Sequence, residues 1–162
     1  MINLVEKELD SMEKKLNDLF SKVSTIVEIE MQSHWSRYLC VLVSGYIEKA
    51  FRIIVEDHVK KRAPKEISDY ISTDMGNKNT INIEKIRRVL DQFRKNLSTE
   101  LDLLLTPQEI LAINSVVVNR NSIAHGGLTN DLTYSRISNY YIGTKSGVRK
   151  LIGLVGKIGD SP

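Results

Sequence analysis

The chain has 162 residues, 41% hydrophobic and 27% charged, which excludes an intrinsically disordered protein and fits a single domain over 1–162. Its formal net charge of +3 permits a nucleic-acid partner without requiring one. Cys40 is the only cysteine, so an internal disulfide is excluded. No segment reaches the roughly 18 apolar residues of a membrane helix. Because the N-terminus also lacks the order of a signal peptide, we expect a cytoplasmic protein that makes no membrane contact.

A long N-terminal helix pair is the first predicted feature. Apolar residues spaced alternately three and four apart predict a helix over 2–31 with one apolar stripe, made of Ile2, Val5, Leu9, Met12, Leu16, Leu19, Val23 and Ile26. Ser33 is a candidate N-cap for a second helix that runs to Arg62. This second helix is apolar nearly all round, which is typical of a helix at the centre of a domain. We expect the two helices to pack antiparallel.

Two shorter helices are expected after this pair. Pro64 stands near the start of one that ends around Asp74, and residues 75–79 have the composition of a loop. The next helix is predicted over residues 83–95. Residues 96–105 give no clear pattern.

The segment Thr106-Pro107-Gln108-Glu109 marks the start of a further helix. It places threonine at the N-cap, proline at the first helical position and glutamate at the third, which is the capping-box arrangement. The helix is predicted to run to His125, where Gly126-Gly127 supplies a left-handed stop.

The last predicted helix covers residues 132–158. Gly143 and Gly147 lie within it, weaken it and permit a break. No period-two pattern of a β-strand competes with the helical pattern anywhere in the chain. The sequence therefore predicts an all-α bundle of five or six helices.

The helix that ends at His125 carries the candidate chemistry. Asn121 and His125 lie one turn apart and can point at the same spot. Arg120 starts about 140° around the helix axis from His125, but its long side chain reaches that spot. A guanidinium beside an apolar stripe must find an anion or strong acceptors.

Glu48, on the second helix, is a candidate partner for this arginine. It lies mid-helix among apolar residues and shares one helix face with Arg37, Val41, Ser44 and Arg52. A buried carboxylate needs a donor just as Arg120 needs an acceptor. We therefore hypothesise that Glu48 orients Arg120 or contacts the Asn121/His125 pair.

Two segments of the chain resemble motifs of a known superfamily. The segment Arg120-Asn121-Ser122-Ile123-Ala124-His125-Gly126 resembles the Arg-x4–6-His motif of HEPN ribonucleases, including the polar residue that often follows the arginine. The segment Ser44-Gly45-Tyr46-Ile47-Glu48 resembles an earlier-helix signature of the RiboL-PSP-HEPN subgroup. The resemblance implies a HEPN-like bundle whose catalytic residues are Arg120, Asn121, His125 and Glu48 and whose substrate-binding residues are Ser44 and Ser122.

The activity that this resemblance implies is metal-independent RNA cleavage. Histidine suits removal of the proton from an RNA 2′-hydroxyl because its unperturbed pKa is ~6.5, and attack by that oxygen leaves a 2′,3′-cyclic phosphate. Arginine suits the charge that develops on the phosphorane, through its fixed donors. Because one histidine cannot readily be both base and acid, we expect a symmetric homodimer with two copies of Arg120 and His125 in one cleft.

The resemblance also implies a biological setting. HEPN proteins commonly act as toxins or effectors in prokaryotic toxin–antitoxin and phage-defence systems. The expected partners are an RNA substrate, a second copy of the chain, and an antitoxin or another regulatory protein. No cofactor is expected.

Two alternatives stay open at this point. The domain could be a non-catalytic HEPN module that binds a partner protein, RNA or a nucleotide, or it could be a structural helical adaptor. In the structural alternative His125 only caps its helix and Arg120 only forms an ion pair. His34 and His58 are expected at the surface, and no cluster of histidine, cysteine or carboxylate residues has the spacing of a metal site.

Overall fold

The computed structural model describes residues 3–127 and 131–159, and every regular element in these ranges is an α-helix. The helices are α1 (Leu4–Ser24), α2 (Ile29–Lys60), α3 (Lys65–Gly76), α4 (Ile83–Phe93), α5 (Leu97–Leu104), α6 (Pro107–Ala124) and α7 (Tyr134–Gly156). The predicted all-α fold is confirmed, but five or six helices are too few because residues 97–104 form the additional helix α5. Ile2, the expected start of the first helix, lies outside the described residues. None of these seven helices is by itself long and apolar enough to span a membrane.

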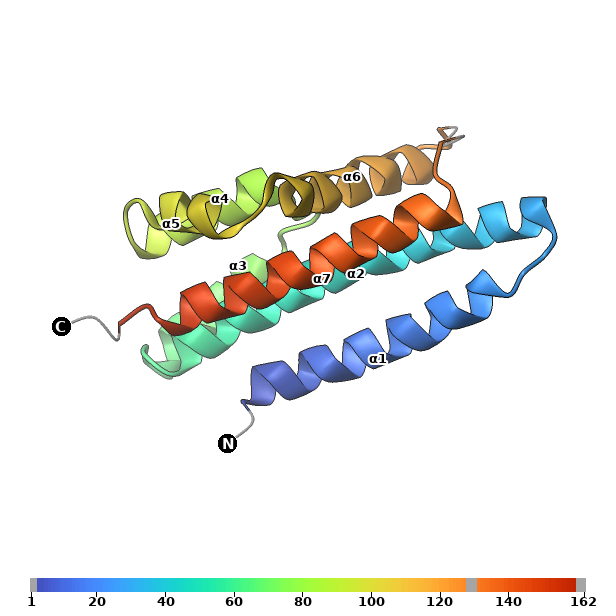
Figure 1. The fold of residues 1–162 in the computed structure, drawn as a ribbon. Coiled ribbons are helices and arrows are strands. Elements are labelled where there is room, and N and C mark those ends of the chain that lie inside the picture. Colours follow the sequence, from blue (N-terminus) through green and yellow to red (C-terminus); the bar gives the residue numbers. More distant parts are fainter. Residues whose placement is uncertain (1–2, 128–130, 160–162) are drawn as a thin grey trace.

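The helices form a bundle in which α2 lies among several neighbours. It packs against α1, α3, α6 and α7, while α6 packs most closely against α7 (Figure 1). α1 and α2 form an antiparallel hairpin, as predicted, and α6 runs antiparallel to both α2 and α7 (Figure 1). The C-terminal end of α6 therefore lies at the same end of the bundle as the N-terminal end of α2.

The boundary between α1 and α2 differs from the prediction. The helix predicted over 2–31 breaks, and α2 begins where the side chain of Glu28 accepts hydrogen bonds from the amides of Glu30 at 3.0 Å and Met31 at 2.8 Å. Ser33, the predicted N-cap, lies inside α2. The apolar spacing continues through the turn and hides the break, and glutamate is not among the side chains that usually cap a helix.

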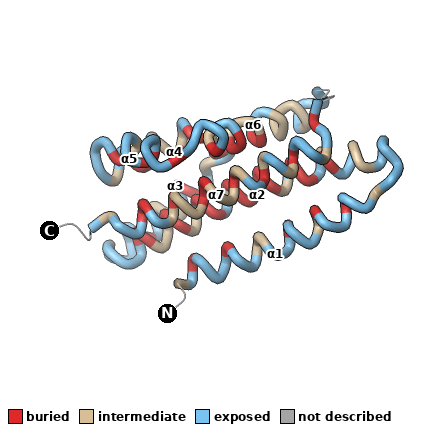
Figure 2. Tube along the Cα trace, in the orientation of Figure 1, coloured by how far each residue is buried: buried red, intermediate tan, exposed pale blue. Residues whose placement is uncertain are grey.

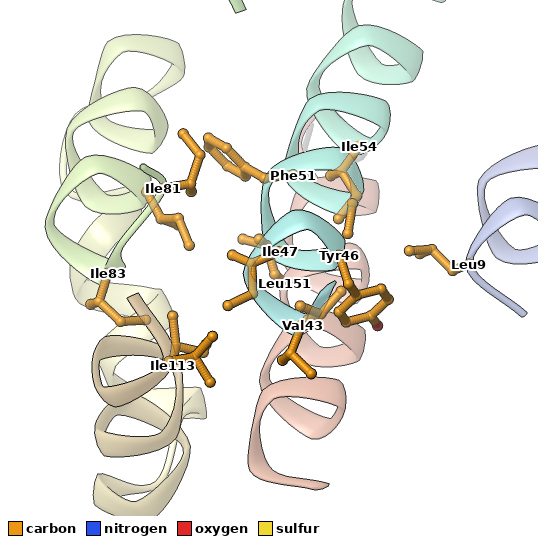
Figure 3. Close-up of a cluster of buried hydrophobic side chains, with 14 of the residues drawn as sticks. Leu9, Val43, Tyr46, Ile47, Phe51, Ile54, Ile81, Ile83, Ile113 and Leu151 are labelled. Atoms are coloured by element: carbon orange, nitrogen blue, oxygen red, sulfur yellow. The ribbon is translucent and has the colours of Figure 1, made fainter. Parts of the chain in front are cut away.

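The core confirms that α2 is central. Its buried side chains face several neighbouring helices, whereas α1 buries a single stripe (Figure 2). Figure 3 shows Phe51 pointing toward Ile81, which precedes α4, and Tyr46 pointing toward Leu9 of α1. Because both sides of α2 are buried in one apolar cluster, the position of this helix is fixed from several directions.

Gly143 and Gly147 do not break α7, contrary to the break that their helix propensity permits. A Cβ atom on Gly143 would lie 2.8 Å from Cβ of Ala112, and one on Gly147 would lie 3.1 Å from Cδ1 of Ile113. Real Cβ atoms do not approach a neighbour as closely as the first of these distances. The two glycines therefore allow α6 and α7 to pack closer than larger residues would.

The segment after α2 also differs in detail. α3 extends to Gly76, two residues into the predicted loop, because Met75 is buried and continues the apolar face of the helix. Helix α4 begins where expected, and the side chain of its N-cap Asn82 accepts a hydrogen bond from the amide of Lys85.

Candidate functional site

The first turn of α6 is held by hydrogen bonds within the turn and to helix α7. Oγ1 of Thr106 accepts a hydrogen bond from the amide of Glu109 at 3.2 Å, and Oε2 of Glu109 accepts one from the amide of Thr106 at 2.8 Å, which confirms the predicted capping box. The buried Glu109 also accepts hydrogen bonds from Ser146 and Lys150 of α7. Burial alone would raise the pKa of Glu109, but the hydrogen bonds outweigh it and hold the pKa below its usual value. This turn fixes α6 against α7.

The last turn of α6 ends in the left-handed stop that was predicted. Gly126 has a φ of 72°, its amide donates to the carbonyl of Ile123 at 3.2 Å, and the amide of Gly127 donates to the carbonyl of Ser122 at 2.7 Å. These two hydrogen bonds make a Schellman motif. They place His125 at the C-cap, where the chain leaves the helix.

Within the described residues, the polar side chains of this last turn have few internal partners. Arg120, Asn121 and Ser122 are half-buried, whereas His125 is exposed. Nη1 of Arg120 donates to Oδ1 of Asn121 at 3.4 Å, a long hydrogen bond. Among residues 3–127 and 131–159, no carboxylate forms an ion pair with Arg120 and no side chain forms a hydrogen bond with the imidazole of His125. A cation and an imidazole therefore stand together at one helix end.

Helix α2 contributes a second arginine to this end of the bundle. Sγ of Cys40 donates to the carbonyl of Val116 at 3.4 Å, which sets the register between α2 and α6. Arg37 precedes Cys40 by one turn and Arg120 follows Val116 by one turn, so in antiparallel helices the two arginines are displaced in the same direction. Nε of Arg37 is buried and has no hydrogen-bond partner among the described residues. Its only sequence signal is the α2 stripe that it shares with Glu48.

The structure does not bring Glu48 or Ser44 to this place. Oε1 of Glu48 accepts a hydrogen bond from the amide of Thr80 at 3.1 Å and so holds the loop between α3 and α4. Glu48 lies about 16 Å along α2 from Arg37, at 1.5 Å per residue. The hypothesised contact of Glu48 with Arg120 or the Asn121/His125 pair therefore does not form within one chain. Ser44 is 2% exposed, which shields its hydroxyl from a substrate.

The other histidines lie apart from the end of α6. His34 is exposed, as expected, but His58 is buried against the ring of Phe93, contrary to the expected surface position. Burial, followed by the charge of Arg62, lowers the pKa of His58. Within the described ranges, no three potential metal-ligating side chains gather in one place.

Comparison with known families adds one finding. The family model described as RiboL-PSP-HEPN matches residues 6–156, which include the end of α6 and nearly all of the helical bundle. No curated protein matches the chain, and no solved structure does so either.

Proposed function

Because the chain belongs to the RiboL-PSP-HEPN family of the HEPN superfamily, whose members are generally ribonucleases, we propose that it is a metal-independent endoribonuclease. One observation supports the location of its site above all others. Arg120, Asn121 and His125 gather at the end of α6 with neither an ion pair nor a hydrogen bond to any other described side chain. Polar groups that stabilise a fold are usually paired where they leave solvent, whereas the half-buried Arg120 and Asn121 pair only with each other among the described residues.

The proposed reaction uses the 2′-hydroxyl of the RNA itself. His125 removes the proton of this hydroxyl, the freed oxygen attacks the adjacent phosphorus, and the bond from phosphorus to the 5′-oxygen breaks. The products are a 2′,3′-cyclic phosphate and a 5′-hydroxyl. Arg120 stabilises the extra negative charge on the phosphorane through its fork of N–H donors, and Asn121 and Ser122 hold a phosphate oxygen or the imidazole. We give Glu48 and Ser44 no step in this reaction, because within one chain the first binds the amide of Thr80 far along α2 and the second is buried.

The proposed site is composite, since the leaving 5′-oxygen needs a proton donor and each chain has one His125. A two-fold homodimer would supply the second imidazole, from His125 of the partner subunit. The surface beside the site supports this arrangement. Val118 is 65% exposed on α6, on the same stripe as Asn121 and His125. On α2, Tyr38 and Val41 are exposed beside Arg37. Neighbouring exposed apolar side chains are typical of association surfaces.

The proposed biological role is that of a toxin or effector in a prokaryotic toxin–antitoxin or phage-defence system. It follows from the family by analogy, because a fold does not fix a pathway. An antitoxin or another regulatory protein would be the partner that restrains cleavage.

The test is cleavage of mixed RNA by the purified protein in EDTA. We expect wild type to leave 2′,3′-cyclic phosphate ends. His125→Ala should lose cleavage by roughly 10²- to 10⁴-fold, the usual contribution of an acid–base group. Arg120→Ala should lose roughly 10²- to 10³-fold, the usual contribution of one charge-stabilising donor. Arg88→Ala is the matched control, because Arg88 is 73% exposed on α4. Cleavage that stops in EDTA, or that survives in both site variants, would contradict the proposal. Inactivity of wild type on every RNA would favour the non-catalytic binding module.

A further inference from the structure

Arg37 and Arg120 lie nearly level on adjacent helices. From the contact between Cys40 and Val116, Arg37 is displaced by about 4.5 Å along α2 and Arg120 by about 6 Å along α6, in the same direction. The helices run antiparallel through this contact (Figure 1). The two guanidinium groups therefore start from neighbouring backbone positions at the same end of the bundle.

Arg37 and Asn121 also lie on stripes that face the same side of the bundle. Arg37 and Glu48 are 11 residues apart, close to three full turns, so they share one stripe of α2. Glu48 on that stripe reaches the loop before α4. On α6, the side chain of Asn114 accepts a hydrogen bond from the amide of Ile83 at the start of α4, and Asn121 follows Asn114 by nearly two full turns. Both stripes thus border the side of the bundle that α4 occupies further along.

The charges on this side of the bundle are unbalanced. Within the described ranges, neither Arg37 nor Arg120 forms an ion pair with a carboxylate, and the buried Nε of Arg37 has no acceptor. Two neighbouring cations repel each other, and a buried donor without an acceptor is unfavourable. Both costs are removed by a polyanion that presents one phosphate to each guanidinium group, as a nucleic-acid backbone does.

We infer that Arg37 is a substrate-binding residue that contacts an RNA phosphate next to the one held by Arg120. This inference rests on the proposed ribonuclease function and extends it to a second helix. Arginine suits the role because its planar fork of donors matches two phosphate oxygens and its charge is permanent. Arg37 would then hold the RNA in register across α2 and α6, while Arg120 and His125 act on the scissile group.

The test is binding of a fluorescein-labelled, fully 2′-O-methylated RNA, which cannot be cleaved through its 2′-oxygens. Wild type, Arg37→Ala, Arg37→Gln and Arg37→Lys are compared over a series of salt concentrations, with Arg88→Ala as control. We expect Arg37→Ala and Arg37→Gln to weaken binding roughly 10- to 100-fold, as for loss of a charge-assisted hydrogen bond. The plot of log affinity against log salt concentration has a negative slope, and in these two variants its magnitude should decrease by about 0.7 for each phosphate that is no longer neutralised. Arg37→Lys keeps the charge and should keep the wild-type slope.

Three results would overturn the role of Arg37. They are an absence of RNA binding by wild type, wild-type binding by Arg37→Ala, and loss of the dimer in Arg37→Ala and Arg37→Gln by sedimentation, which would assign Arg37 to the interface. Cleavage of unmodified RNA separates this inference from the proposed function. If Arg37→Ala cleaves and binds like wild type, only the inference fails. If binding depends on Arg37 but neither wild type nor any variant cleaves, only the ribonuclease proposal fails.

Discussion

The two ends of helix α6 are built in opposite ways. At its start, the polar side chains of Thr106 and Glu109 are used fully, in a capping box and in hydrogen bonds to Ser146 and Lys150 of α7. At its end, Arg120 and His125 have no charged partner among the described residues. The first end has its hydrogen bonds satisfied internally, as a structural element should. At the second end the guanidinium and imidazole groups stay available to a ligand, which is why we propose the functional site there.

The largest expected effect of this contrast is on catalysis. Arg120→Ala should reduce RNA cleavage by roughly 10²- to 10³-fold, as for loss of one charge-stabilising donor. Its thermal midpoint should stay near that of wild type, because no carboxylate among the described residues is left unpaired. Cleavage rates and melting curves of the same preparation check both parts. A drop in the thermal midpoint large enough to account for the lost cleavage would show that Arg120 is structural.

The converse change is at the start of α6. Glu109→Ala removes the capping box and leaves Lys150 without its carboxylate, so we expect a loss of about 2–4 kcal/mol in the free energy of unfolding. Urea unfolding measures it. The folded fraction should cleave RNA at nearly the wild-type rate. Selective loss of activity without loss of stability would contradict the assignment of the two ends.

A smaller effect is expected where α6 meets α7. Gly143→Ala should lower the free energy of unfolding by about 1–3 kcal/mol. Its new methyl group would lie 2.8 Å from Cβ of Ala112, too close for two packed helices to accommodate without a shift. Gly153→Ala is the matched control on the same helix, since nothing lies within 4 Å of its added Cβ. In the control, the free energy of unfolding should rise by about 0.5–1 kcal/mol, because alanine has a higher helix propensity than glycine. Equal effects of the two substitutions would show that close packing does not hold α6.

The smallest effect concerns His58, which contrasts with the exposed His125. Burial and the nearby charge of Arg62 lower the pKa of His58 in the folded chain, so below the unfolded value of about 6.5 the unfolded chain binds a proton that the folded chain does not. Stability should therefore fall as the pH drops from 7.5 to 5.5. His58→Gln should flatten this dependence in urea unfolding, whereas the exposed His34→Gln should not.

Local patterns predicted much of this contrast. The capping box at Thr106 and the stop at Gly126-Gly127 depend on residues within one turn, and both are confirmed. The break before α2 was missed because Glu28 is an unusual cap and the apolar stripe continues through the turn. The tight packing at Gly143 depends on Ala112 of another helix, which no local pattern reveals.

The register between helices could not be predicted from the sequence. Glu48 shares a stripe with Arg37, and periodicity alone could not tell which of them lies beside Arg120. The contact between Cys40 and Val116 decides it, and it joins two residues that are 76 positions apart in the chain. His58 was expected at the surface because a helix end is usually exposed, but Phe93 from α4 covers it.

The central claim is that two copies of the end of α6 meet in one cleft. It is tested most directly by the distance between spin labels on Ala124→Cys in the dimer. Cys40 should stay unlabelled, because burial raises its pKa to about 12 and keeps it as an unreactive thiol. We predict a single label-to-label distance shorter than α6 itself, which is about 27 Å long, and a longer one for the control Leu103→Cys, which lies on α5 just before the start of α6. A protein that cleaves RNA while its Ala124→Cys labels are farther apart than its Leu103→Cys labels would contradict the account.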